Sequence, residues 1–177
     1  MCGQLSTFIA RAKEAMEQPQ PEPESFSLTV LHQNDLHANL NNIARTVTAV
    51  NEQRAQNDNT LLLNAGDVFS GTLYFTEYRG QADVTFLNMM GVDAFTFGNH
   101  EFDLGSSSDG HQALAELIDS AQFPIVSSNV DFSKDEALAD FQTRTISDNP
   151  QDGRVYDAII KTIDGEKVGI FGLTTAE

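Results

Sequence analysis

The sequence predicts an α/β domain organised around a largely parallel sheet. Short apolar runs that suit buried strands alternate along the chain with longer segments whose apolar residues recur at helical spacing. This β-α-β-α order favours parallel strands joined by right-handed crossovers, with helices on the faces of the sheet. The 177 residues are enough for one domain with a substantial core, and 40% of them are hydrophobic.

The first 25 residues are expected to precede this domain. Apolar residues at helical spacing predict a short amphipathic helix over residues 4–17. The proline-rich segment 18–24 then predicts an extended linker, so the folded domain would span residues 26–177. No apolar run approaches the length that crosses a bilayer, and residues 1–25 lack the continuous apolar segment of a secretory signal.

Four strands of the sheet are predicted from the short apolar runs. In chain order they cover residues 26–32, 60–64, 93–97 and 124–128. After the second strand comes a segment rich in Gly, Ser and Thr, which is expected to be a loop.

Three helices are predicted between these strands, because apolar residues share one face in each segment. The helices cover residues 41–56, with Ile43, Val47 and Val50 on one face, residues 81–90, with Val84, Leu87 and Met90, and residues 111–121, with Leu114, Leu117 and Ile118.

The pattern changes after the fourth strand. The polar segment 131–153 is expected to be a surface excursion. Residues 156–163 and 167–173 then predict a hairpin, because the Asp164-Gly165 pair between them suits a type I′ turn.

The charge balance argues against nucleic acids and anionic membranes as partners. The net charge is −16, and the ten Lys and Arg residues are scattered along the chain. An anionic substrate would be repelled unless bound cations reverse the local field. Most of the carboxylates are expected only to keep the protein soluble. The single cysteine, Cys2, excludes an internal disulfide.

Polar side chains follow three successive strands at the point where each strand ends. Asp35 and His37 follow the first strand, Asp67 follows the second, and Asn99 and His100 follow the third. Because the carboxyl ends of parallel strands meet at one edge, where open α/β sheets place ligands, these residues describe one site. Carboxylate, imidazole and amide groups bind divalent cations, and a carboxylate can bridge two of them. The pattern therefore predicts a metal-dependent hydrolase.

A second pair lies within the third motif. Asp103 can accept a hydrogen bond from the imidazole of His100 and so fix its tautomer and charge. Glu101, between them, is expected to cap a helix or to be solvated. His32 is expected to be a core histidine or to support a ligand, and His111 to open a helix at the surface.

The order of these motifs resembles that of the calcineurin-like metallophosphoesterases. The extended segments 31–37, 64–72 and 98–103 are similar in particular to the bacterial 5′-nucleotidase / UDP-sugar hydrolase branch. The resemblance runs over residues 28–130 and more loosely to residue 175. It implies the N-terminal portion of a metallophosphatase-type α/β/β/α sandwich, incomplete in this chain, whose mixed sheet contains parallel β-α-β units.

The resemblance also implies roles for individual residues. Two divalent ions, such as Mn, Zn or Mg, would be held by four side chains: Asp35, His37, Asp67 as the bridge, and Asn99. His100 and Asp103 would form the catalytic dyad. The implied reaction is 5′-nucleotidase-like hydrolysis of a phosphate ester by two-metal hydroxide attack, with charge in the transition state stabilised by the cations and the histidine.

Two departures from the family pattern bear on activity. Ala38 stands where the family usually has Gly, a mild change if the backbone there keeps a negative φ. The family takes further histidine ligands from downstream, whereas His111 is the only histidine after His100. We therefore expect a truncated chain that is weakly active alone, with the remaining ligands supplied by a missing C-terminal half of the same protein.

Other interpretations share the same motifs. The 2′,3′-cyclic-nucleotide phosphodiesterase/3′-nucleotidase and thiosulfohydrolase branches share the same site, and a non-catalytic relative would keep the sheet and one metal as a binding module. Because relatives are mostly exported, the resemblance implies a periplasmic or extracellular location, although no signal peptide is visible in the chain.

Overall fold

The computed structural model describes residues 25–105 and 108–175 and confirms the predicted parallel sheet. In chain order the elements are β1 (Thr29–Gln33), α2 (Ile43–Gln56), β2 (Thr60–Asn64), α3 (Leu73–Tyr78), α4 (Gln81–Met90), β3 (Ala94–Phe95), the 3₁₀ turn η1 (His100–Phe102), α5 (Ser108–Ser120), β4 (Ile125–Val126), the 3₁₀ turn η2 (Ala139–Phe141), β5 (Ile146–Ser147), β6 (Val155–Tyr156), β7 (Ala158–Ile163) and β8 (Glu166–Phe171). The predicted helix 4–17, the linker 18–24 and Cys2 lie outside the described residues.

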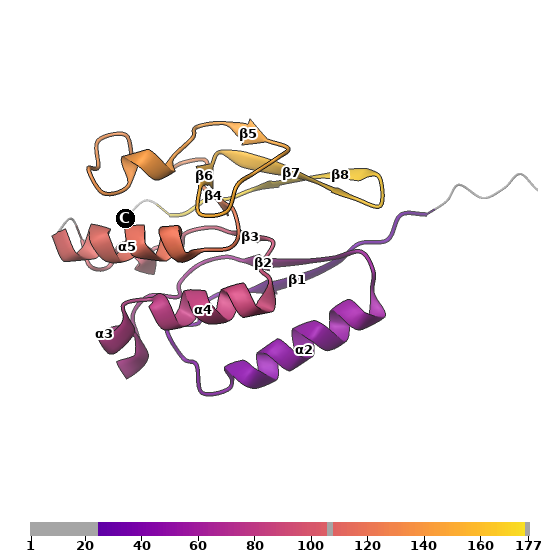
Figure 1. Cartoon of the computed structure of the whole chain (residues 1–177), viewed down its shortest axis with the longest axis horizontal. Helices are drawn as coiled ribbons and strands as arrows, with labels where there is room; N and C mark the ends of the chain where they lie inside the picture. The colour runs from indigo at the N-terminus through magenta and orange to yellow at the C-terminus, as the bar shows by residue number, and fades with distance from the viewer. Residues whose placement is uncertain (1–24, 106–107, 176–177) are drawn as a thin grey trace, which may run out of the picture.

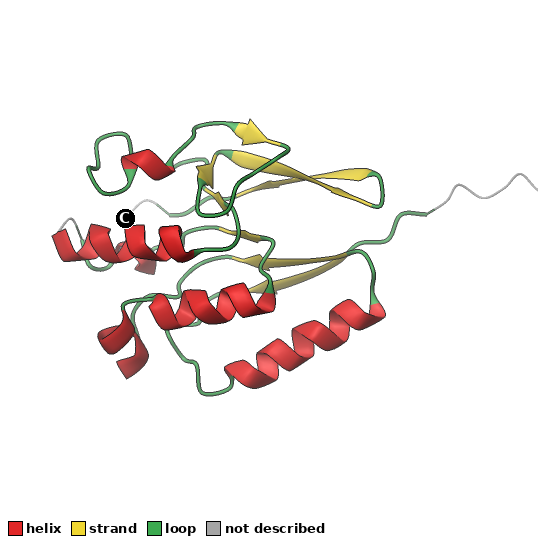
Figure 2. Cartoon of the chain, in the orientation of Figure 1, coloured by secondary structure: helices red, strands yellow, loops and turns green. Residues whose placement is uncertain are grey.

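The strand order of the main sheet explains how the layers are arranged. Its five strands are all parallel and run in the order β1-β2-β3-β4-β6. Each new strand is added on the same side, so right-handed crossovers place α2, α4 and α5 on one face (Figure 1). A smaller sheet, β5-β7-β8, covers the opposite face, and Figure 2 shows the two strand layers on one side of the helices. The described chain thus contains α, β and β layers of the expected sandwich.

Side chains of the main sheet belong to two separate hydrophobic cores, because successive residues of a strand point to opposite faces of the sheet. Toward the helices, one core contains the strand residues Leu62, Phe95, Ile125 and Val155. Toward the smaller sheet, the other contains Leu61, Ala94, Val126, Tyr156, Ile159 and Ile170. The second core holds the two sheets together.

An ionic network ties the three layers together at the amino end of β3. Asp93 accepts hydrogen bonds from the backbone N–H of Leu62 (2.8 Å), from Arg54 of α2 (3.3 Å) and from Lys161 of β7 (2.5 Å). Arg54 also donates to the carbonyl oxygen of Gly91 (2.6 Å), just after α4 ends. Helices, main sheet and smaller sheet are therefore joined through one carboxylate.

The predicted hairpin is confirmed, but its first strand is shorter than expected. Residues 155–156 belong to the main sheet as β6, and the chain crosses to the smaller sheet at Asp157. β7 and β8 then pair antiparallel around Asp164 and Gly165, whose φ values of 49° and 84° are both positive, as a type I′ turn requires.

The expectation of a surface excursion over residues 131–153 is wrong in part. Phe132 and Leu138 are buried in the helix-side core. The segment folds back because the Gln142 carboxamide accepts from the backbone N–H of Phe132 and donates to the carbonyl of Val130 (2.8 Å each). Polar residues here satisfy the backbone of a packed segment, so polarity alone did not mark exposure.

The loop expected after β2 contains the short helix α3. Thr72 caps it by accepting a hydrogen bond from the backbone N–H of Tyr74 (3.2 Å). Phe69 and Phe75 pack against each other beneath it, with ring centroids 5.0 Å apart, whereas Tyr74 and Tyr78 are exposed. Phe69 and Phe75 are therefore the packed aromatic residues of this loop.

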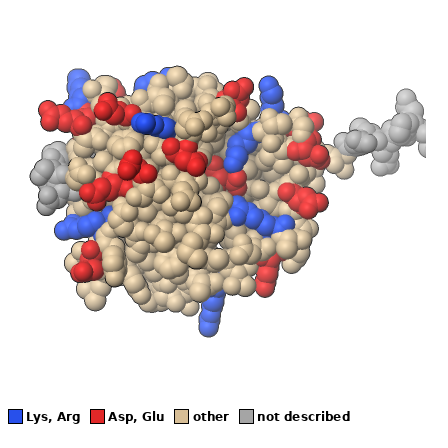
Figure 3. All heavy atoms as spheres, viewed as in Figure 1, with Lys and Arg blue, Asp and Glu red and all other residues tan. Residues whose placement is uncertain are grey.

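Two properties of the surface bear on partners. Among the described residues, no helix has both the length and the apolar composition that a membrane span requires. On the face drawn in Figure 3, Lys and Arg side chains stand apart from one another among Asp and Glu side chains. This face offers no basic patch.

Candidate functional site

The loops after β1 and β2 run side by side beyond the ends of their strands. The backbone N–H groups of Asp35, His37 and Ala38 donate to the carbonyl oxygens of the second loop, at 3.2, 2.9 and 3.0 Å. Their acceptors are Gly66, Asp67 and Val68. Because the pairing of the strands continues into the loops, the backbone itself places His37 beside Asp67.

The two loops have an unusual backbone. Positive φ values occur at five non-glycine residues: Asp35 (54°), His37 (46°), Ala38 (49°), Asp67 (55°) and Ser70 (69°). Such conformations are uncommon in L-residues and cluster at functional sites. The condition under which Ala38 would be a mild replacement for Gly is not met, because its φ is positive. The buried alanine carries a strain that glycine would avoid.

Two glycines allow the second loop, which follows β2, to touch the third loop, which follows β3. A Cβ atom on Gly66 would lie against the backbone of Gly98, and one on Gly98 would lie against the Asp67 carboxylate. Both contacts fall well inside the 3.0 Å that real Cβ atoms keep. Gly66 also has a φ of 85°. These positions therefore require glycine for the loops to approach.

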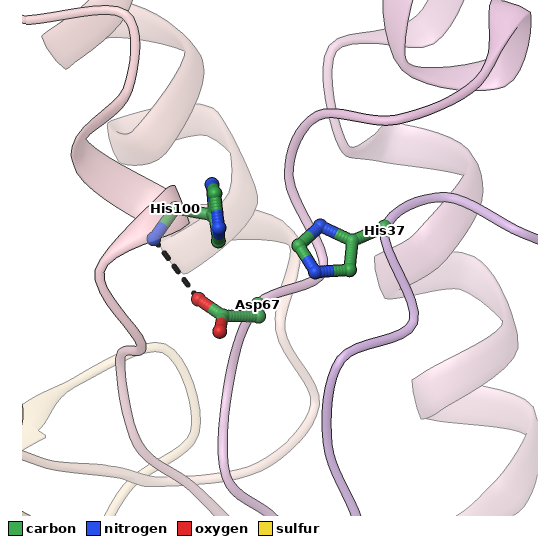
Figure 4. Close-up of side chains that lie close together, drawn as sticks. All are labelled: His37, Asp67 and His100. Carbon is green, nitrogen blue, oxygen red and sulfur yellow. Dashed lines mark hydrogen bonds between the residues drawn. The ribbon is translucent and has the colours of Figure 1, made fainter.

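Three side chains from the three loops converge on one space, as Figure 4 shows. His37, Asp67 and His100 each offer one ligand atom, and these atoms lie within 4.8 Å of one another. The imidazole rings meet edge to face, with centroids 4.6 Å apart and planes at 77°. The backbone N–H of His100 donates to Oδ1 of Asp67 (2.9 Å), which fixes the carboxylate against the third loop.

Each histidine has one ring nitrogen held by the protein. Nδ1 of His37 lies 3.1 Å from Oγ of Ser70 and 3.3 Å from the carbonyl oxygen of Phe69. Nδ1 of His100 lies 2.6 Å from Oδ2 of Asp103, so the predicted pair is formed. This hydrogen bond raises the pKa of His100; partial burial opposes the shift, and the nearby carboxylates of Asp103, Asp67 and Glu101 add to it.

Asp35 and Asn99 lie at the margins of the cluster. The Asp35 side chain is 57% exposed, and its Oδ1 is 3.7 Å from Nε2 of His37. Asn99 precedes η1 and, with Asp103, lines a cavity of about 490 Å³ that also involves Asn129. The structure thus brings His37, Asp67 and His100 together, with Asp35 at the rim and Asn99 beside the cavity.

Glu101 is a residue whose place the sequence analysis predicted wrongly. Its side chain is neither solvated nor a helix cap: only 1% is exposed, and its two oxygens accept hydrogen bonds from four backbone N–H groups. Burial raises the pKa of Glu101, while these four donors oppose the shift. The sequence carried no signal for this role beyond the position of Glu101 inside the third motif.

The two remaining histidines lie outside the cluster. His32 is exposed on β1 instead of belonging to the core. His111 of α5 forms an ion pair through Nδ1 with Oδ2 of Asp135, which joins the helix to the segment after β4. Its expected place near the surface is confirmed by its partial exposure.

The cluster suits a divalent cation. Two imidazole nitrogens and a carboxylate oxygen are a donor set that zinc and similar ions accept in proteins. The glycines that let the loops meet leave these three side chains facing one space. The residues present therefore fit the metal that the sequence motifs imply.

Comparison with known proteins assigns the chain to one family. The model of the calcineurin-like phosphoesterase family matches residues 28–162, and the chain belongs to this family. It is 45% identical over 171 residues to the trifunctional nucleotide phosphoesterase protein YfkN of Bacillus subtilis (strain 168), covering 89% of this chain and 12% of that protein. It is 35% identical over 189 residues to the NAD 5′-nucleotidase of Haemophilus influenzae, covering 97% of this chain and 28% of that protein.

A solved structure agrees with the sequence matches. The 5′-nucleotidase precursor from Thermus thermophilus superposes with a TM-score of 0.70 at 38% identity, covering 85% of this chain and 29% of that one. The chain therefore spans less than a third of the length of these relatives.

Proposed function

We propose that this chain forms part of the active site of a divalent-metal phosphoesterase that hydrolyses nucleotides in the manner of a 5′-nucleotidase. The observation that carries the proposal is the meeting of His37, Asp67 and His100 at the carboxyl edge of three adjacent strands. The names of the relatives support the substrate class: a nucleotide phosphoesterase and 5′-nucleotidases.

We assign the metal ligands by position in the three loops. Asp35 and His37 would hold one cation, Asp67 would lie between two, and Asn99 would reach the second from the side of the cavity. Two divalent ions, when bound, would offset the negative charge of a phosphate ester and lower the pKa of water near it. His100 faces the same space as His37 and Asp67.

His100 and Asp103 would act as the catalytic dyad. The Asp103 carboxylate holds Nδ1, so that Nε2 is the nitrogen left to face the site. The raised pKa of His100 keeps the imidazole protonated nearer to neutral pH. A protonated Nε2 can donate a hydrogen bond to a phosphoryl or leaving-group oxygen as charge grows there. The cavity beside Asn99 and Asp103 offers space for the remainder of the substrate.

The location of the protein is also proposed by likeness. The Thermus thermophilus relative is named as a precursor, which is consistent with an exported protein. We place this chain in the periplasm or outside the cell on the same basis.

Metal binding is the first test of this proposal. Mn²⁺ is titrated by calorimetry into the purified chain, into Asp67→Ala and into Asp58→Ala, a control at a carboxylate in the loop before β2, at the opposite end of that strand from the site. We expect saturable binding in the chain and in the control, and loss of binding in Asp67→Ala, because Asp67 is the central carboxylate of the cluster. Equal binding in all three proteins would refute the assigned centre.

Ester hydrolysis is the second test. With Mn²⁺ present, three reactions are compared in the protein and in Asp67→Ala: release of phosphate from 5′-AMP, opening of 2′,3′-cyclic AMP to a nucleoside monophosphate, and release of sulfate from a thiosulfate ester. We expect weak turnover of 5′-AMP that disappears in the variant. Preference for the cyclic nucleotide or the thiosulfate ester would assign the chain to another branch, and metal binding without turnover of any ester would count against hydrolysis by these residues alone.

A further inference from the structure

We propose that Glu101 is a positioning residue, which sets the geometry of the metal site by binding the backbones of the two loops that carry Asp67 and His100. The inference rests on the proposed metal site for its consequence, but its structural basis is independent of any metal. Glu101 itself faces away from solvent and reaches the site only through these backbones.

The contacts of Glu101 join the second and third loops at both carboxylate oxygens. Oε2 accepts from the backbone N–H groups of Asp67 (2.9 Å) and Gly98 (2.6 Å). Oε1 accepts from those of Val68 (2.8 Å) and Phe69 (3.3 Å). One side chain from the third loop therefore accepts hydrogen bonds from three consecutive backbone amides of the second loop and from one amide of its own loop.

This arrangement suits a carboxyl group, because each of its two oxygens can accept from two backbone donors. Three consecutive N–H groups that point at one side chain also fix the path of the second loop, which has a positive φ at Asp67. Glu101 thus offsets the strain of the turn that directs the Asp67 carboxylate.

The same contact sets the position of His100 relative to Asp67. The backbone N–H of His100 donates to Oδ1 of Asp67, and Glu101 is the next residue along the chain. Releasing Glu101 would let the loops separate at Gly66 and Gly98, where they touch without side chains between them. The Asp67 carboxylate would then no longer be held in its place beside His37 and His100.

The variant Glu101→Gln tests this inference with almost no change in size. One oxygen becomes an NH₂ group, so in either orientation of the amide at least one backbone donor meets another donor. Glu52→Gln, at an exposed glutamate on α2, is the matched control. Three measurements are made on each protein: amide hydrogen exchange in the metal-free state, Mn²⁺ affinity by calorimetry, and the visible spectrum of bound Co²⁺, which reports ligand geometry.

We expect Glu101→Gln to remain folded by circular dichroism, to exchange the amides of Asp67, Val68, Phe69 and Gly98 faster, and to bind Mn²⁺ about 10- to 100-fold more weakly, the usual loss when a group supporting a metal ligand is removed. The Co²⁺ spectrum should shift at saturating metal, which a general loss of stability would not cause. Should the glutamine variant fail to fold, Glu101→Asp, which keeps the charge, is measured in the same way.

The outcomes separate this inference from the proposed function. Unchanged Mn²⁺ affinity and an unchanged Co²⁺ spectrum in Glu101→Gln would overturn the positioning role and leave the metal site standing. If the unmodified chain binds no metal, the proposed function fails at this site. The exchange rates in the metal-free state then decide whether Glu101 joins the loops: unchanged rates overturn it.

Discussion

Asp83 is predicted to make the fold lose stability as the pH rises. It lies in the first turn of α4 with 1% of its surface exposed, and among the described residues no other residue donates a hydrogen bond to its carboxylate. Burial raises the pKa of Asp83 to about 7; its own backbone N–H opposes this shift, and the charge of Glu101 adds to it. The replacement that removes this proton equilibrium at nearly constant size is Asp83→Asn.

The sign and size of the effect follow from proton linkage. Between the ordinary pKa of 3.8 and about 7, the unfolded chain loses the proton of Asp83 while the folded chain keeps it. The unfolded state therefore binds fewer protons, and stability falls as the pH rises through this window. At about 1.4 kcal/mol per pKa unit, the total loss is about 4 kcal/mol, complete near neutral pH. An asparagine at position 83 does not titrate in this pH range, so the variant lacks this loss of stability.

Urea unfolding followed by circular dichroism measures this difference. The free energy of unfolding is compared for the unmodified chain, Asp83→Asn and Asp119→Asn, an exposed aspartate on α5, from about pH 4 to about pH 8. We expect the unmodified chain and the control to lose about 4 kcal/mol more than Asp83→Asn over this range. Parallel pH profiles for all three proteins would refute the reasoning, because they would show that Asp83 titrates alike in both states.

Two further predictions concern the site. Gly98→Ala places a Cβ atom against the Asp67 carboxylate, so we expect Mn²⁺ binding by calorimetry to be lost; retained affinity would show that the loops can separate without harm. Asp103→Asn replaces by a neutral amide the carboxylate whose hydrogen bond raises the pKa of His100, so NMR titration should find that pKa lower, toward its ordinary value of 6.5. Because the folded pKa is raised, the pair stabilises the fold below pH 6.5, and this contribution is lost as the pH rises through the folded pKa. An unchanged pKa in the variant would contradict the role given to Asp103.

The sequence was sufficient to predict the parallel sheet and the loops of the site. Asp35, Asp67 and Asn99 each follow an apolar run, and parallel strands bring the ends of such runs to one edge whatever the tertiary details. The pairing of His100 with Asp103 was equally accessible, because it is local in the chain.

Features that depend on distant contacts were not accessible in this way. The burial of Glu101 arises because amides of another loop need an acceptor, and no pattern around Glu101 encodes this. The crossing of the chain between sheets at Asp157 depends on which strand edge is free in three dimensions. Similarly, the positive φ at Ala38 follows from hydrogen bonds with the neighbouring loop, since alanine alone disfavours it.

The ionic network around Asp93 has a consequence for how variants of the site can be interpreted. It joins the three layers at the amino end of β3, whereas the functional loops leave the carboxyl ends of the same sheet. The Asp93 network and the metal cluster thus lie at opposite edges of the sheet and have no residue in common. A site variant that stays folded while losing its cation therefore reports on the chemistry of the loops and not on the integrity of the sheet.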